Sequence, residues 1–77
     1  MRFILRGKAY DLTREDVEQA MRGIQPEAAR LYFFNIKGKK FPPKQILSVS
    51  LNLARIEFTT ADATNLLKRL GFELQKY

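Results

Sequence analysis

The 77-residue chain contains no cysteine, no histidine and no tryptophan. Without cysteine it can form neither a disulfide bond nor a thiolate zinc site, so a packed core must supply its stability. Without histidine and cysteine it also lacks the commonest general base and the strongest nucleophile of enzymes. Its eight acidic residues show no spacing typical of a paired catalytic site or a metal-ligand cluster. We therefore expect a protein that is not an enzyme by itself and that has no metal site and no cofactor.

Long apolar stretches are also missing. The N-terminal run MRFILRGKAYDL is too short for a signal peptide or a membrane helix, and no later stretch approaches 18 apolar residues. A hydrophobic fraction of 45% is nevertheless ordinary for a globular protein, so disorder is not expected. The sequence predicts one small basic domain, residues 1–77, in a cytoplasmic protein that does not associate with membranes.

Acidic residues are absent from the middle of the chain. Residues 30–56 hold six basic side chains and no acid, whereas residues 1–29 hold five of each sign and residues 57–77 hold three of each. The net charge of +6 therefore arises in the middle segment. Its basic residues are Arg30, Lys37, Lys39, Lys40, Lys44 and Arg55. We expect them to form one basic face that binds an anionic partner.

The first third of the chain carries the pattern of a hairpin followed by a helix. Apolar and polar residues alternate on either side of Gly7, which predicts two short strands with Gly7 in the turn. Thr13 and Asp16 have the spacing of a helix-capping pair, and an apolar stripe at helical spacing follows. We expect that helix to end near Gly23 to Gln25, because Pro26 disfavours helical geometry in the residue before it.

The basic middle segment predicts a strand, a turn and a helix. Residues 31–36 are apolar on both faces, which favours a central strand, and residues 37–40 form a Lys-Gly-Lys-Lys turn. Pro43 suits the first position of a helix that we expect to continue through Ala54. The stretch from residue 34 to 41 resembles that from 3 to 10 at an offset of 31, as though each were a strand with a basic-Gly turn.

The last third predicts a brief extended piece at residues 57–58 and a helix capped by Thr59 or Thr60. Gly71 stands where a left-handed residue closes a helix, with Phe72 folding back onto Leu67. Residues 73–75 predict a final edge strand. The fold class that follows is α+β, with short antiparallel strands and hairpins packed against three helices in a single domain.

The predicted helix offers side chains that suit nucleic acid. A polar stripe on the face opposite the apolar one carries cations for phosphates, a hydroxyl donor and an amide that can pair with an adenine edge. Its members are Lys44, Ser48, Asn52 and Arg55, with Gln45 beside them. A polar face is also what any surface helix shows, so the missing acid is the more specific signal.

The turn at Lys37–Lys40 is the second candidate contact. Basic hairpin tips straddle a duplex or enter a groove, although lysine also protects strand edges from pairing. Tyr32 and Phe34 would stack on bases if their rings were exposed, whereas packing into the core is the expectation for a domain of this size.

One family resembles this chain between Tyr32 and Phe72. The shared residues are Tyr32, Gly38-Lys39, Phe41-Pro42, Lys44, Ile46, Phe58, Ala63, Leu67 and Leu70-Gly71-Phe72. Together they resemble a small N-terminal module of modification-dependent HNH restriction endonucleases, with its Tyr-Pro-x-Lys-x-Ile and Leu-Gly-Phe pattern. The resemblance implies engagement of DNA rather than cleavage, with Lys39 and Lys44 as basic contacts, in a restriction-related setting in bacteria or phage.

The chain departs from that module in several places. It has Phe41 for the usual tyrosine, a second proline at Pro43, Thr59-Thr60 where a glycine pair is frequent, and no nuclease domain. The leading hypothesis is a non-catalytic DNA-binding module that uses the basic turn and the polar face of the following helix. RNA is an alternative ligand. A protein-interaction module, which binds an acidic partner or forms a homodimer, is the alternative of a different class.

Overall fold

The computed structural model describes residues 1–28 and 31–77. The described elements are, in chain order, β1 (Arg2–Leu5), β2 (Lys8–Asp11), α1 (Arg14–Ala20), β3 (Tyr32–Ile36), β4 (Lys39–Phe41), α2 (Pro43–Leu51), a short 3₁₀ helix η1 (Arg55–Glu57), α3 (Thr60–Arg69) and β5 (Leu74–Lys76). The strands form two antiparallel sheets, β1–β2 and β4–β3–β5. This arrangement confirms the predicted α+β class.

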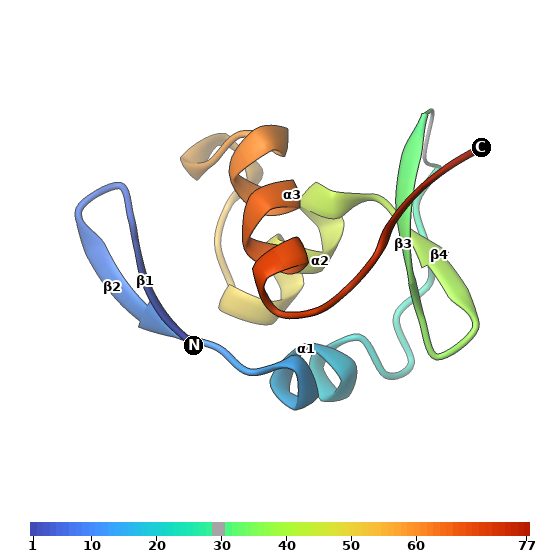
Figure 1. Ribbon diagram of the computed structural model, residues 1–77, viewed down its shortest axis with the longest axis horizontal. Helices are drawn as coiled ribbons and strands as arrows, with labels where there is room; N and C mark the ends of the chain where they lie inside the picture. The colour runs from blue at the N-terminus through green and yellow to red at the C-terminus, as the bar shows by residue number, and fades with distance from the viewer. Residues whose placement is uncertain (29–30) are drawn as a thin grey trace.

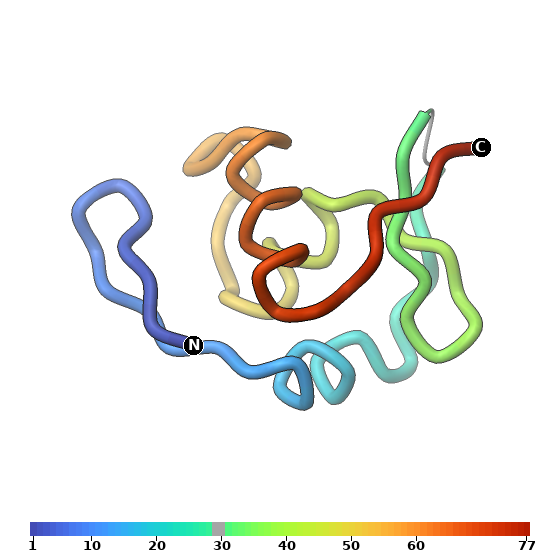
Figure 2. The backbone as a smooth tube through the Cα atoms, viewed as in Figure 1, coloured from blue at the N-terminus to red at the C-terminus, as the bar shows by residue number. Residues whose placement is uncertain are grey.

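The two sheets lie on opposite sides of the helices. Figure 1 shows the β1–β2 hairpin at one end of the long axis and the β4–β3–β5 sheet at the other, with α2 and α3 between them. The tube in Figure 2 shows α1 running along one side of the helices and joining the two ends. The two hairpin turns therefore project at opposite ends of a molecule whose longest extent is 32 Å.

The β1–β2 hairpin turns through Arg6 and Gly7, as predicted. Both residues have a positive φ, 51° and 79°, which is the backbone of a type I′ turn. Phe3 and Leu5 are buried, whereas Ile4 on the other face is 75% exposed. The alternation in the sequence therefore sets which face of this hairpin packs on the helices.

Helix α1 begins as predicted and ends early. The Thr13 hydroxyl accepts from the amide of Asp16 at 3.1 Å, and the Asp16 carboxylate accepts from the amide of Thr13 at 3.0 Å. The helix ends at Ala20 rather than near Gly23 to Gln25. Hydrogen-bonded turns follow the helix at Met21, and Gly23 has a positive φ of 78°. The chain therefore leaves the helix before it reaches Pro26.

The three-stranded sheet has β3 in the centre and β5 at an edge, and both predictions are confirmed. Phe34 lies opposite Phe41 on one side and opposite Leu74 on the other. Phe34, Phe41 and Ile36 are buried in the same core cluster as residues of the helices. One face of the sheet therefore closes the core.

Helix α2 is shorter than the predicted helix that ran through Ala54. It starts at Pro43 as expected, but Asn52 adopts the left-handed conformation with φ 55° and ends it at Leu51. The Ser48 hydroxyl donates to the carbonyl of Leu53 at 2.6 Å, and the Ser48 carbonyl accepts from the amide of Leu53 at 3.0 Å. Asparagine is the residue that tolerates this conformation best after glycine, so it acts here as a helix terminator.

The C-terminal third follows its local signals closely. Thr59 and Asp62 form a capping box at the start of α3. At its end, Gly71 has φ 100°, and the amide of Phe72 donates to the carbonyl of Leu67 at 3.1 Å, the predicted Schellman closure. Only the extended piece predicted at residues 57–58 needs correction, because residue 57 belongs to η1.

The core is built around α2. Its buried residues Ile46 and Leu47 meet Phe34 and Phe41 of the sheet and Phe58 before α3 in one cluster. Among the described residues, no helix is long and apolar enough to cross a membrane.

Candidate nucleic-acid interface

The β3–β4 turn is an exposed part of the predicted basic surface. Lys37 and Gly38 have φ values of 52° and 85°, and Ile36 pairs with Lys39, so the turn contains two residues of type I′. The side-chain oxygen of Asn35 accepts from the amide of Gly38 at 3.0 Å and steadies the loop. The turn presents Lys37, Lys39 and Lys40 within a few residues of one another; we call these three lysines the basic tip.

Lys37 occupies a backbone conformation that suits it poorly. Type I′ turns favour Asn-Gly or Gly-Gly, because a residue with a β-carbon and no local polar group is strained at positive φ by about 1 kcal/mol. The other hairpin has the same feature, with Arg6 at φ 51°. Both tips therefore carry a cation at a position where the turn favours glycine or asparagine.

Two lysines of the basic tip border a hollow against α1. Lys37 and Lys39 line it together with the end of that helix, and its volume is about 530 Å³. The Lys37 ammonium lies 4.0 Å from the carboxylate of Glu18, and its side chain is 73% exposed. The Lys39 ammonium lies 3.5 Å from the carbonyl of Ile24. These contacts are long and solvated, so both cations can exchange them for a phosphate.

The remaining lysines lie against aromatic rings. The Lys40 ammonium is 5.1 Å from the ring centre of Phe33 and 5.5 Å from that of Tyr77. Lys44, on the first turn of α2, is 5.5 Å from the ring centre of Phe58 and is half-buried. Cation–π contacts leave the ammonium hydrated on one side, so these cations are held in place without being neutralised.

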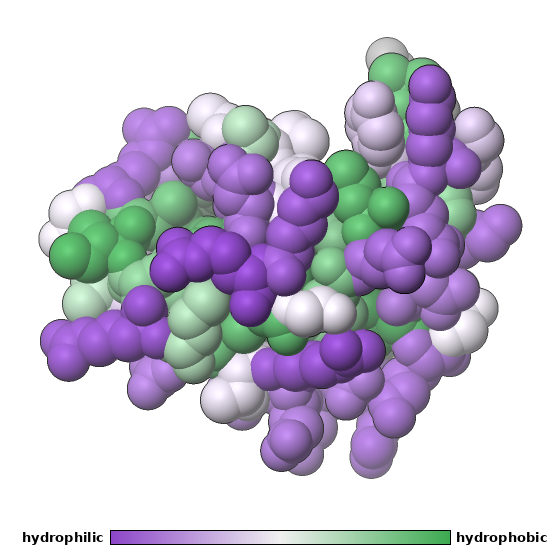
Figure 3. Space-filling model, in the orientation of Figure 1, coloured by the Kyte–Doolittle hydropathy of each residue, from purple (hydrophilic) through white to green (hydrophobic). Residues whose placement is uncertain are grey.

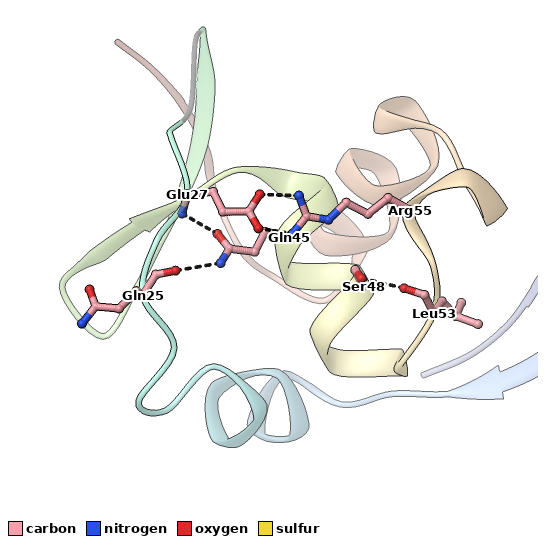
Figure 4. Close-up of polar contacts among 6 residues, drawn as sticks. All are labelled: Gln25, Glu27, Gln45, Ser48, Leu53 and Arg55. Carbon is pink, nitrogen blue, oxygen red and sulfur yellow. Dashed lines mark hydrogen bonds and ion pairs between the residues drawn. The ribbon is translucent and has the colours of Figure 1, made fainter.

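Gln45 is buried, so its predicted role beside the polar stripe is wrong. It is 4% exposed, and its amide nitrogen donates to the carbonyl of Gln25 at 2.8 Å. Its amide oxygen accepts from the backbone amide of Glu27 at 2.9 Å. Figure 4 shows this side chain joining α2 to the neighbouring segment that carries Gln25 and Glu27. Gln45 therefore ties two parts of the chain together and cannot reach a base.

The predicted polar stripe does not form. Asn52 ends α2, and Arg55 lies on η1, so neither extends the helical face that Lys44 begins. The Arg55 guanidinium instead donates to both carboxylate oxygens of Glu27 (Figure 4). This pairing lowers the pKa of the Glu27 carboxyl and raises the pKa of Arg55, chiefly through the hydrogen bonds between them. Ser48 is committed to the carbonyl of Leu53. Arg30, another predicted contact, lies outside the described residues.

The aromatic prediction also needs correction. Phe34 is fully buried and cannot stack on a base, while Tyr32 on the same face is 46% exposed. The exposed ring is that of Tyr77, which packs on the buried ring of Phe33 and was not among the predicted contacts. The alternation of side chains along a strand could have placed Phe33 on the face opposite to Phe34. The contact with Tyr77 could be predicted only from the pairing of β3 with β5.

The surface mixes polar and apolar residues. Figure 3 shows hydrophilic and hydrophobic residues interspersed on the visible face, with a green area over the end that holds the β1–β2 hairpin. Across residues 1–28 and 31–77, no three acidic side chains come together to hold a metal ion. Of the predicted contacts, the structure brings Lys37, Lys39 and Lys40 together at one turn, with Lys44 four residues after Lys40.

The family model described as SCO5918-like matches residues 1–77. No curated protein and no solved structure matches the chain. Because the match spans its whole length, the chain belongs to the SCO5918-like family.

Proposed function

We propose that this member of the SCO5918-like family is a non-catalytic module that binds double-stranded DNA through the basic tip, with Lys44 as a flanking contact. The observation that carries the proposal is the tip itself, where three lysines share a protruding turn and one of them, Lys37, holds a strained left-handed conformation. The positions that the restriction-module resemblance implies, Lys39 and Lys44, belong to the same segment.

The shape of the turn fits the major groove. A two-stranded β-ribbon is narrow enough to enter that groove, which is about 12 Å wide. Lys39 and Lys40 are consecutive in β4, so their side chains leave opposite faces of the ribbon. Lys37 lies at the turn itself, so we expect it to enter the groove deepest, with Lys40 on the outer side of the ribbon and Lys39 on the side that faces α1 as flanking cations.

The local electrostatics favour a polyanion. Residues 31–56 contain no acid, so a phosphate that approaches the basic tip meets repulsion only from side chains of other segments, of which Glu18 is the nearest described. The Glu18 carboxylate is 4.0 Å from the Lys37 ammonium, and the Lys37 side chain is 73% exposed while that of Glu18 is 24% exposed, so the pair contributes at most about 1 kcal/mol. When DNA binds, the release of counterions from its phosphates offsets the loss of this ion pair.

Specificity for a base sequence is expected to be low. Of the two amides that were predicted to pair with base edges, Gln45 is buried, and Asn52 is exposed but ends α2, so it does not lie on the helical face that Lys44 begins. Binding therefore depends on phosphates. Four lysine contacts give a slope of about −3.6 or shallower for the logarithm of affinity against the logarithm of salt.

The test is fluorescence anisotropy with a labelled DNA duplex between about 50 and 200 mM salt. The tip variant Lys37→Glu/Lys39→Glu should lose binding at the lower salt, and its slope should shrink by about 2. The matched control is Lys68→Glu/Arg69→Glu, which makes the same charge change in the exposed last turn of α3. Equal losses in both variants would show that net charge, and not the tip, attracts DNA.

A protein partner is the second candidate, because β4 and β5 are the outer strands of the larger sheet. Within the described ranges neither pairs with a further strand, and such edges are templates for another chain. Light scattering distinguishes the two functions: a dimer in the absence of DNA, together with no duplex binding, would favour self-association.

A further inference from the structure

The β4–β3–β5 sheet has a second face, which points away from the helices. In antiparallel pairs, directly opposed residues share a face, so Asn35 lies beside Lys40, and Phe33 beside Gln75. We call this surface the outer face. Its residues are Phe33, Asn35, Lys40, Gln75 and Tyr77.

A ring pair dominates the outer face. Phe33 and Tyr77 have ring centres 4.6 Å apart at a tilt of 46°, and the Lys40 ammonium lies within 5.5 Å of both. Phe33 is 5% exposed yet does not belong to the main core cluster, because Tyr77 and Lys40 cover it from outside. The Tyr77 amide donates to the carbonyl of Leu31 at 3.0 Å, which fixes the backbone beneath the ring.

Tyr77 packs on Phe33 on one side and is open to water on the other. The residue is 60% exposed, although its ring rests on another ring and beside a cation. A large aromatic ring held open to water in this way is available to stack on another ring. Asn35 and Gln75, both exposed, add amide donors and acceptors on the same face.

The charge on this face selects the ligand. None of the five outer-face residues is acidic, and one of them, Lys40, is a cation. An exposed aromatic ring, adjacent amides and a cation are the groups that bind unpaired bases, by stacking, hydrogen bonding and phosphate contact respectively. Duplex DNA hides the faces of its bases, so this face suits a single strand.

We propose that the outer face binds single-stranded nucleic acid, with one base stacked on Tyr77 and Lys40 neutralising an adjacent phosphate. The two sites share Lys40 but differ in their central residues, because Tyr77 follows β5 whereas Lys37 and Lys39 belong to the turn between β3 and β4. Duplex binding through Lys37 and Lys39 and base stacking on Tyr77 can therefore each fail while the other stands.

The experiment measures anisotropy of a labelled oligothymidine of about ten nucleotides and of an abasic oligomer of the same length. Tyr77→Ala should weaken oligothymidine binding about 5- to 150-fold, the range for loss of one stacked base. Abasic and duplex binding depend on Lys40 and the other cations rather than on stacking, so they should weaken far less, although the Lys40 ammonium lies 5.5 Å from the Tyr77 ring centre. Tyr77→Phe keeps the ring and should bind like the parent. Tyr32→Ala is the matched control, since Tyr32 is 46% exposed on the opposite face of the same sheet.

Tyrosine fluorescence provides an independent readout, because the chain has three tyrosines and no tryptophan. Quenching by oligothymidine should persist in Tyr32→Phe and shrink in Tyr77→Phe. The proposal is overturned if Tyr77→Ala binds oligothymidine like the parent, or if it weakens abasic and oligothymidine binding equally. It is also overturned if Tyr77→Ala converts a dimer into a monomer, since the face would then be an interface between copies. The tip variant Lys37→Glu/Lys39→Glu, measured on the duplex in parallel, reports on the duplex contact alone.

Discussion

Replacing Gln45 separates a structural role from a base-reading role most sharply. The sequence placed this amide beside a DNA-reading face, whereas the structure buries it with hydrogen bonds to the carbonyl of Gln25 and the amide of Glu27. Gln45→Met keeps the length and approximate volume of the side chain while it removes both hydrogen bonds. The change therefore leaves two backbone polar groups of the neighbouring segment without these partners.

The expected cost is moderate. A buried polar group that loses its partner costs about 1–3 kcal/mol, and water reaches residues 25 and 27 more easily than it reaches Gln45, so we expect about 2 kcal/mol in total. For a domain of this size, that lowers Tm by about 8–16 °C. Gln45→Glu should cost more at neutral pH, because its carboxylate would face the carbonyl of Gln25 in a buried site.

The assay combines thermal unfolding with duplex binding measured well below Tm. Gln45→Met should unfold at lower temperature and bind the duplex with the parent's affinity and salt slope. Loss of duplex binding with an unchanged Tm would refute the structural role and restore Gln45 as a DNA contact. Faster hydrogen exchange at Glu27, the amide that Gln45 accepts from, should accompany the loss of stability.

Three further predictions follow from local geometry. Lys37→Asn should stabilise the protein by up to about 1 kcal/mol in denaturant unfolding, because asparagine suits the positive φ of that turn, and should weaken duplex binding because it removes a cation; greater stability with unchanged affinity would exclude Lys37 as a contact. Thr59→Ala should cost about 1 kcal/mol in the same measurement, because it removes the capping hydroxyl of α3; an unchanged midpoint would refute that role. The backbone amide of Thr59 lowers the pKa of Asp62, so Asp62 contributes stability above the ordinary carboxyl range and loses it as the pH falls through that range; Asp62→Asn should therefore flatten the acid-unfolding curve, and an unaltered curve would contradict the assignment.

Much of the fold was predictable because its signals are local. The caps at Thr13 and Thr59 each need only an acid three residues later, and the closure at Gly71 needs only a glycine between a helix and an apolar residue. The central position of β3 followed from its apolar character on both faces. Helix ends were harder to predict. Asn52 was expected inside the second helix, but its left-handed conformation ends that helix.

The candidate site was less predictable because its determinants lie far apart in the sequence. Gln45 finds partners 18 and 20 residues earlier, and Arg55 pairs with Glu27 across 28 residues. The spacing of polar and apolar residues within α2 predicts neither contact. Tyr77 joins the outer face only through pairing between β3 and β5. The basic tip was visible in the sequence because a two-residue hairpin turn brings its lysines together by itself.

Amide chemical shifts in a titration of the isotope-labelled protein with duplex DNA test the central claim most directly. The account predicts that the largest shifts fall on residues 36–40, with smaller ones at the start of α2 near Lys44. Shifts confined to α3 or to the β1–β2 hairpin, or a titration that leaves the amides of Lys37 and Gly38 unmoved, would contradict it.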